Sequence, residues 1–221
     1  MSLINCARPG CRDVFHAFLV EKAAYEGFIE IPKIDYGDFK PNRLMSFSKA
    51  VKSKDFDCWV HFYEDDAVFE RIWNNPRKYL PLLEKFNGVI CPDFSLYRDM
   101  PLVMQYWNIY RSRAIGRWLQ DNGINVIANV RWGDYRTHGV CCLGVPHKGT
   151  ISIGSHGCLR IKEDRECFVK GLNAVLKELN PRVLVIYGAA PDAIFDAYRE
   201  SGIEILQFDS DYAVSRRKEG V

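Results

Sequence analysis

Short runs of β-branched and aromatic residues alternate with longer segments of helical periodicity along most of this sequence. Six of these runs are expected to be strands, at residues 58–63, 88–91, 125–128, 150–153, 183–187 and 203–208. No two-residue hairpin signal joins one run to the next, so crossover connections are expected. The alternation predicts an α/β fold with a mainly parallel six-stranded sheet and helices on both faces, and a partial TIM-like barrel is the alternative.

The expected helices have recognisable ends. One begins with Asp and Pro and ends with Asn-Gly, across residues 99–123. Two others cover 164–180, which an Asp begins, and 191–202, which a Pro begins and a Gly ends. The first helix carries an apolar stripe at helical spacing, which we predict to be core rather than a base-stacking surface. The stripe consists of Val103, Tyr106, Trp107, Tyr110, Ala114 and Trp118.

The pattern divides the chain into three parts. Residues 1–55 are heterogeneous and are expected to form an N-terminal extension or lid. Residues 56–212 carry the strand and helix alternation and form the predicted α/β domain, and residues 213–221 resemble a solvated tail. Within the domain, residues 138–142 also fit an added edge strand.

Composition excludes several classes of protein. With 48% hydrophobic residues and a net charge of +2 over 221 residues, the chain is neither intrinsically disordered nor a polyanion-coating protein. Its eight cysteines, without a charged and apolar leader, predict reduced thiols and a cytoplasmic location. No apolar stretch reaches the roughly 20 residues needed to cross a bilayer, so no membrane partner is expected.

The residues just after each predicted strand are the first candidates for a ligand site, because parallel sheets bind ligands beyond the carboxyl ends of their strands. From Arg98 to Arg136 the sequence carries six Arg, three Asp and no Lys or Glu. Arginine matches phosphate with a planar fork, so this basic stretch predicts a phosphorylated ligand, with Arg131 at a strand end as its main contact. The alternative is structural, with Arg113 and Arg117 on a solvated helix face and Arg111 bracing a loop.

Carboxylates at strand ends predict general acid or base chemistry. Asp93 follows the second predicted strand and Asp134 follows the third, and we take these two as the candidate catalytic residues. Further carboxylates follow the first strand at 64–66 and the sixth at Asp209. The alternative for Asp93, as for Ser95 and other polar loop residues, is a cap that binds backbone N–H groups.

Neither metal nor cofactor is expected. Six ligand-type residues lie close together but lack the paired spacing of a zinc knuckle: His138, Cys141, Cys142, His147, His156 and Cys158. The glycine-bearing loop at 154–157 matches no nucleotide-binding motif, and we predict a tight turn there.

Several local motifs resemble an uncharacterised family, a domain of unknown function carried by phages, prophages and bacterial mobile elements. They are Pro-Asp-Phe-Ser at 92–95, Tyr-Arg at 110–111, Asn-Val-Arg-Trp-Gly at 129–133, Gly-Val-Pro at 144–146 and Tyr-Gly at 187–188. The resemblance covers roughly residues 10–210 and implies a phage context in a bacterial host cell, without an activity to carry over.

Three hypotheses follow. The first is a hydrolase or transferase acting on a nucleotide or nucleic acid, and the second is a protein that binds such a ligand without turnover. The third is an inhibitor of a host protein, with Tyr97 or Trp132 as anchors. For the first two, the expected ligand-binding residues are Arg131, Trp132, Asn129, Arg111, Ser95, Tyr97 and Arg98. The sequence leaves the oligomeric state open.

Overall fold

The main sheet consists of seven parallel strands that follow one another in sequence order. The computed structural model describes residues 13–219. The strands are β3 (Leu44–Ser46), β4 (Trp59–His61), β5 (Gly88–Ile90), β6 (Val126–Asn129), β7 (Thr150–Gly154), β8 (Val183–Tyr187) and β9 (Glu204–Phe208). All six predicted strands are present. The seventh, β3, is additional and lies within the segment expected to be an extension.

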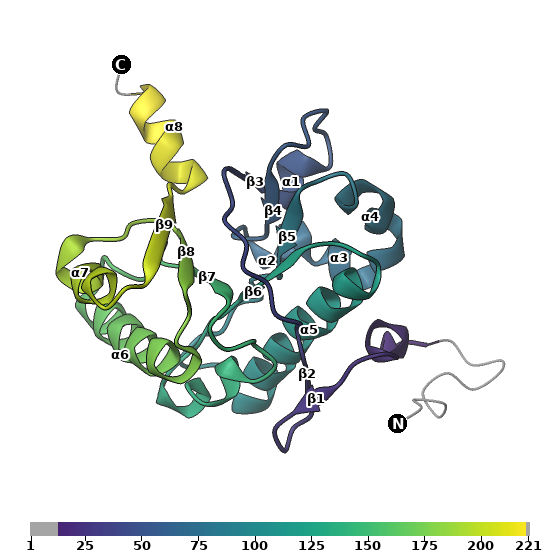
Figure 1. The fold of residues 1–221 in the computed structure, drawn as a ribbon, viewed down its shortest axis with the longest axis horizontal. Coiled ribbons are helices and arrows are strands. Elements are labelled where there is room, and N and C mark those ends of the chain that lie inside the picture. Colours follow the sequence, from purple (N-terminus) through teal and green to yellow (C-terminus); the bar gives the residue numbers. More distant parts are fainter. Residues whose placement is uncertain (1–12, 220–221) are drawn as a thin grey trace.

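The sheet curls into a half barrel (Figure 1). Right-handed crossovers between neighbouring parallel strands place the connecting helices on one face, and the long helices lie along the convex side of the curl (Figure 1). The helices are α1 (Phe47–Ala50), α2 (Asp66–Phe69), α3 (Arg71–Asn74), α4 (Pro76–Leu83), α5 (Leu102–Asp121), α6 (Lys162–Leu179), α7 (Asp192–Glu200) and α8 (Asp211–Glu219). The predicted parallel α/β fold is confirmed, and its form is the partial-barrel alternative rather than a sheet covered on both faces by helices.

Alternate residues of the strands pack into two apolar clusters. On the helix side lie Val60, Val89, Val126, Ile151 and Leu184. On the concave side lie Trp59, Ile90, Ile127, Val183 and Val185. The inner strands β4 to β8 are therefore buried on both faces, as is usual for a parallel sheet, whereas β9 at the edge is partly exposed.

The N-terminal segment packs onto the barrel. It holds a short 3-10 helix, η1 (Ala17–Val20), and a two-stranded ribbon, β1 (Tyr25–Glu26) with β2 (Ile31–Pro32). Beyond the ribbon, the Phe39 ring lies 5.2 Å from that of Trp59, and the Phe39 carbonyl accepts a hydrogen bond from Thr150 Oγ1 at 2.8 Å. The chain around Phe39 thus covers concave apolar surface at the amino end of β7.

Helix α5 buries a different face from the one predicted. Ala114 and Trp118 are buried as expected, but Val103 and Trp107 of the predicted stripe are exposed. The buried face of α5 includes polar side chains, namely Gln105, Asn108, Arg111, Ser112 and Arg113. These side chains bind loops that pack on the helix, a role that apolar periodicity does not reveal.

The solvated position expected for Arg113 is therefore wrong. Its guanidinium is buried and donates to the carbonyls of Asn129 at 2.7 Å and Cys141 at 2.9 Å. Arg117 is also largely covered, between Asp35 and Asp121. Both arginines fasten other parts of the chain to α5.

Two expectations for irregular segments also differ from the structure. Residues 138–142 follow the 3-10 turn η2 (Tyr135–Thr137) and contain a second one, η3 (Val140–Cys142), instead of an edge strand. Helix α8 begins at Asp211, takes up most of the expected tail and projects from the body of the molecule (Figure 1). Within residues 13–219, no helix has the length and apolar character to cross a membrane.

Candidate functional site

Two adjoining cavities lie at the carboxyl ends of the strands. The larger, which we call the central cavity, has a volume of about 630 Å³ and is bounded by the loops after β4, β5, β6, β7, β8 and β9. The smaller, the tryptophan pocket, has a volume of about 300 Å³ and is lined by Trp132 and Phe168 among others. Tyr97, Arg131 and His156 line both cavities. The site is therefore at the sheet edge where parallel α/β proteins bind ligands.

A buried polar network forms part of the wall of the central cavity. Asp93 accepts a hydrogen bond on Oδ1 from Asn129 Nδ2 at 2.7 Å, and on Oδ2 from an Arg131 guanidinium nitrogen at 2.6 Å. Asn129 Oδ1 accepts in turn from the Tyr63 hydroxyl at 2.9 Å, and this hydroxyl lies 2.6 Å from Ser152 Oγ. The network joins the carboxyl ends of four neighbouring strands, β4 to β7.

Burial sets the protonation behaviour of Asp93. Desolvation raises the pKa of its carboxyl group, and the charge of Arg131 and the Asn129 hydrogen bond oppose this increase only in part. A carboxyl group with a raised pKa exchanges a proton more readily near neutral pH than an exposed aspartate does. Asp93 therefore has the electrostatic setting of a general acid or base.

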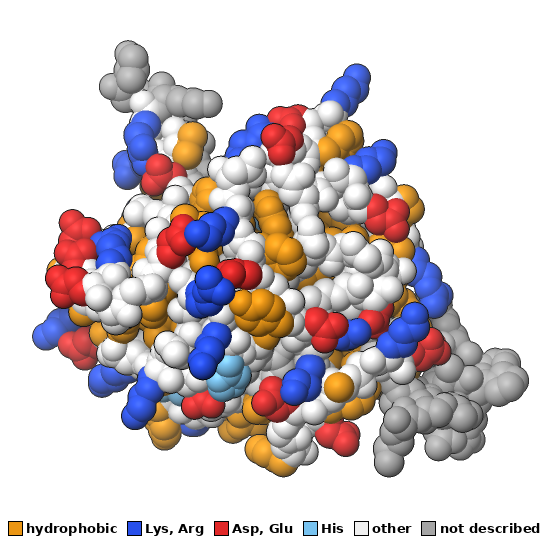
Figure 2. Space-filling model, viewed as in Figure 1, with side chains coloured by type: hydrophobic (Ala, Val, Ile, Leu, Met, Phe, Trp, Pro, Cys, Tyr) orange, Lys and Arg blue, Asp and Glu red, His pale blue; other side chains and the backbone are white. Residues whose placement is uncertain are grey.

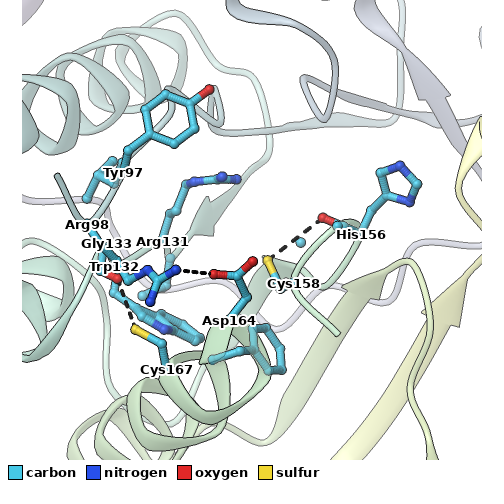
Figure 3. Close-up of a pocket in the computed structure, with 14 residues that line it drawn as sticks. Tyr97, Arg98, Arg131, Trp132, Gly133, His156, Cys158, Asp164 and Cys167 are labelled. Carbon is cyan, nitrogen blue, oxygen red and sulfur yellow. Dashed lines mark hydrogen bonds and ion pairs between the residues drawn. The ribbon is translucent and has the colours of Figure 1, made fainter. Parts of the chain in front are cut away.

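Arg131 keeps part of its binding capacity. One guanidinium nitrogen contacts Asp93, and Nε is buried without a hydrogen-bond partner among the described residues, so a ligand can reach only the terminal guanidinium nitrogens. The side chain is 30% exposed, and its guanidinium points into the open space between Tyr97 and His156 (Figure 3). Arg131 can thus contact Asp93 and a ligand at the same time.

Aromatic rings lie behind the network. Tyr63 stacks on Tyr187 with ring centroids 4.8 Å apart, and His61 lies 4.5 Å from Tyr187. Burial lowers the pKa of His61 to about 3, and its Nδ1 accepts the Tyr63 backbone N–H at 3.1 Å. His61 is therefore a neutral structural acceptor.

The rim of the central cavity is acidic, and its carboxylates have partners within the chain. Asp66 binds the backbone and hydroxyl of Ser95, and Asp65 caps α2. Glu64 binds Ser48, and Asp211 pairs with Lys49. With Asp93, the lining of the central cavity has five carboxyl groups and one arginine, Arg131. The cavity therefore suits the hydrogen-bond donors of a ligand, such as hydroxyl and amino groups.

Most of the predicted binding residues lie at this site. Asp93, Asn129 and Arg131 form one network, and Ser95 and Tyr97 line the central cavity. Trp132 is buried in the wall of the tryptophan pocket, against Phe168. Arg98 also lines that pocket and is paired with Asp164, as Figure 3 shows.

Arg111 lies elsewhere, on the buried face of α5. Its guanidinium binds Glu70 and Asn108, both at 2.6 Å, and stacks 3.9 Å over the Phe94 ring. Asn108 in turn donates to the Ser95 carbonyl. Arg111 thus has the loop-bracing geometry considered as its alternative role.

Asp134 is also outside both cavities. It caps η2 through the Arg136 backbone N–H and pairs with the Arg136 side chain. These contacts lower the pKa of Asp134, so its carboxylate is ionised and engaged in local structure. Of the two candidate catalytic carboxylates, only Asp93 lines a cavity.

The sequence did not predict Tyr63, Ser152 or Tyr187 as site residues, and Tyr187 entered only as part of a family motif. All three lie in or next to predicted strands, whose period-two alternation indicates only which face each side chain occupies. The one feature that could have pointed to them is a hydroxyl-bearing side chain, Tyr or Ser, near the carboxyl end of each predicted strand at 58–63, 150–153 and 183–187.

The described histidines and cysteines do not form a metal-binding group. Within the described chain, no group of three or more His, Cys, Asp or Glu side chains is arranged to hold a metal ion. Burial raises the pKa of the Cys158 thiol, which contacts the His156 carbonyl rather than its ring. The six described cysteines are free thiols.

Comparison with known proteins places the chain among phage proteins. The family model for a domain of unknown function, DUF4417, matches residues 23–209. A "Gene 1 protein" of Mycobacterium phage L5 is 33% identical over 187 residues, which cover 82% of this chain and 80% of the relative. A "Gene 1 protein" of Mycobacterium phage D29 is 39% identical over 129 residues, covering 58% of this chain and about half (48%) of that relative. No solved structure gives a significant match.

Proposed function

We propose, from the premise that this chain belongs to the DUF4417 family, that it binds a phosphorylated ligand, a nucleotide or a nucleic acid, at the carboxyl edge of the half barrel. The relatives are phage proteins, so the proposed setting is the cytoplasm of an infected bacterium.

The observation that carries this proposal is the Asp93–Arg131 pair. Burying an ion pair costs desolvation energy that its Coulomb attraction often fails to recover, so stability alone is a weak reason for one. Here the pair lies beside two cavities, and the Arg131 side chain, which is 30% exposed, has terminal N–H donors beyond the one that Asp93 uses. The guanidinium is thus held in place for an anionic group of the ligand.

The remainder of the site fits a nucleoside. Carboxylate oxygens on the rim accept hydrogen bonds from sugar hydroxyl or base amino groups. Tyr97 is 56% exposed beside both cavities and offers a face for base stacking. The volumes of about 630 and 300 Å³ lie in the usual range for small-molecule sites.

Two forms of this function differ in the role of Asp93. Its raised pKa favours hydrolysis or group transfer, with Asp93 exchanging the proton. Both of its oxygens, however, already accept hydrogen bonds, which favours binding without turnover. Consumption of the bound ligand, lost in Asp93→Asn, distinguishes the enzyme from the binding protein.

Host-protein inhibition is a second candidate function, favoured by one surface. Tyr97, Val103, Met104 and Trp107 are exposed at the start of α5 and in the loop before it. Exposed aromatic and Met side chains are typical of protein interfaces. Recovery of a single host protein that is lost with Trp107→Ala, alongside absent nucleotide binding, would support this second function.

The test is calorimetric titration of wild type and Arg131→Ala with nucleoside phosphates and short oligonucleotides at low salt. Arg131→Ala is expected to weaken binding by about 10- to 100-fold, the range for a charge-assisted hydrogen bond. The matched control is Arg136→Ala, because Arg136 also pairs with an aspartate but lines neither cavity. No binding by wild type, or equal binding by Arg131→Ala and wild type, would refute the proposal.

A further inference from the structure

A third cavity adjoins the central one and has the opposite electrostatic character. It has a volume of about 420 Å³ and lies between the loop after β7, the turn after β8 and helix α8. We call it the α8 pocket. Its lining includes Arg160, Arg216 and Arg217, together with Tyr212.

Two of these arginines retain an uncompensated charge. Arg217 pairs with Asp209 at 2.6 Å, whereas neither Arg160 nor Arg216 has a carboxylate partner among the side chains that the structure describes. Their guanidinium carbons lie 5.6 and 5.5 Å from the centre of the Tyr212 ring. The α8 pocket therefore combines two available cations with an aromatic face. Figure 2 shows basic side chains on the projecting α8.

The backbone of the pocket is also suited to an anion. Gly188 has a φ of +118°, and a Cβ there would lie 2.6 Å from Ser155 Oγ and 2.9 Å from the His156 nitrogen. The absence of a side chain lets the turn after β8 approach the loop after β7. Within the described chain, the N–H groups of His156 and Gly157 donate to no protein acceptor, so they remain available.

The three cavities form a continuous series. His156 lines all of them, and its ring lies 5.9 Å from that of Tyr212, which lines the central cavity and the α8 pocket. Tyr97 at one end is 56% exposed and Tyr212 at the other is 48% exposed. Arg131 lies on the same path as Arg160 and Arg216, so cations and stacking faces recur along it.

We propose that this series of cavities binds single-stranded nucleic acid, with a phosphodiester group in the α8 pocket on Arg160 and Arg216. A mononucleotide occupies at most one cation site and one stacking face, whereas a strand of a few nucleotides uses both ends of the series. Backbone contacts from cations with bases stacked on aromatic rings are the general means by which proteins hold single strands. This inference rests on the proposed function and identifies the ligand class.

The test is fluorescence anisotropy with labelled 12-nucleotide oligothymidylate and oligouridylate, and with labelled thymidine monophosphate, over a range of salt concentrations. Wild type is expected to bind the oligonucleotides at least tenfold more tightly than the mononucleotide. Arg160→Ala/Arg216→Ala is expected to weaken oligonucleotide binding at least tenfold and to reduce the salt slope by roughly 0.7 per lost phosphate contact. The DNA and RNA probes distinguish the two sources of the strand.

Arg182→Ala is the matched control, because Arg182 is exposed and pairs with Asp38 at the opposite, amino edge of the sheet. Equal oligonucleotide affinity and salt slope in the double variant and this control would overturn the inference. So would equal affinity of wild type for the mononucleotide and the oligonucleotides. If Arg131→Ala still weakens mononucleotide binding, the proposed function survives. If wild type binds none of the probes, both fail.

Discussion

Single residues at the site owe their properties to burial. His61 is 1% exposed, and burial lowers its pKa to about 3. The charge of Asp211 opposes this shift and that of Lys49 adds to it, but desolvation dominates. The imidazole is consequently neutral at pH values near neutrality.

This burial predicts acid sensitivity. Below about pH 6.5 the unfolded chain protonates His61 whereas the folded chain does not, so the free energy of unfolding falls as pH decreases towards 3. The contribution approaches about 1.4 kcal/mol per pH unit. Urea unfolding between pH 7 and 5 is expected to show a smaller loss of stability in His61→Gln than in wild type. His147→Gln, a change at an exposed histidine, serves as the control; equal slopes in all three proteins would contradict the prediction.

The Asp93 carboxylate competes with any anion for Arg131. Asp93→Asn removes this negative charge at little change in shape, and we expect it to tighten binding of a phosphate-bearing ligand by about tenfold, equivalent to about 1.4 kcal/mol. Calorimetric titration measures the change. Asp134→Asn is the control, since Asp134 pairs with Arg136 away from the cavities. Weaker binding by Asp93→Asn than by this control would show that Arg131 does not contact the anion.

The pKa of Asp93 provides a second readout in the same variant. Because the folded-state pKa is raised, the folded chain holds its proton to higher pH than the unfolded chain does. The free energy of unfolding should therefore decrease as pH rises from about 3.8 through the folded pKa, and Asp93→Asn should remove this contribution. Urea unfolding across this range checks it, and an unchanged pH dependence in Asp93→Asn would count against the raised pKa.

Among the secondary-structure elements, α6 packs against Trp132 of the tryptophan pocket. A Cβ at Gly171 would lie 2.1 Å from Trp132 Nε1, so this glycine makes room for the ring that lines the tryptophan pocket. Helix packing and pocket shape are therefore coupled at one residue.

Gly171→Ala is expected to destabilise the protein by roughly 1–3 kcal/mol, the usual cost of overpacking. In an unhindered helix the same change stabilises by about 0.5–1 kcal/mol, so the sign is diagnostic. Denaturant unfolding measures it, and the double variant Gly171→Ala/Trp132→Ala should show less than the sum of the two single losses. A Gly171→Ala protein at least as stable as wild type would disprove the contact.

The strands and the site residues differ in how well the sequence predicted them. Short runs of β-branched and aromatic residues identified six strands, whereas β3 (Leu-Met-Ser) contains no β-branched or aromatic residue and is only partly buried. Asp93, Asn129 and Arg131 were found because polar residues directly follow apolar runs. Tyr63 and Ser152 were missed because they belong to runs that otherwise look like strand core, and Arg113 was wrongly expected on a solvated face because a buried polar helix face resembles a solvated one.

At the scale of the whole molecule, the half barrel has a concave face that needs a cover. The chain around Phe39 provides it at the amino end, through Trp59 and Thr150. The alternation of strands and helices predicted the parallel sheet. It did not predict that the segment around Phe39 packs on the concave face, because a contact between residues more than 100 positions apart leaves no local sequence pattern.

Phe39→Ala is accordingly expected to destabilise the whole domain by about 2 kcal/mol, the lower end for a large-to-small change at a partly buried ring. For a chain of this size, a loss of 2 kcal/mol lowers Tm by roughly 4–8 °C. Phe28→Ala is the control, because the Phe28 side chain is 84% exposed and its loss should leave Tm unchanged. Equal Tm values for the two variants would exclude a covering role for Phe39.

The strand order has a consequence for synthesis on the ribosome. Each strand of the sheet pairs with the strand translated just before it, so a nascent chain can extend its sheet one strand at a time. The exception is the segment around Phe39, whose partner Thr150 is translated 111 residues later. We expect this segment to remain open to protease on ribosomes stalled before β7 and to become protected once β7 has emerged. The part of the domain that is made first is then among the last to reach its final position.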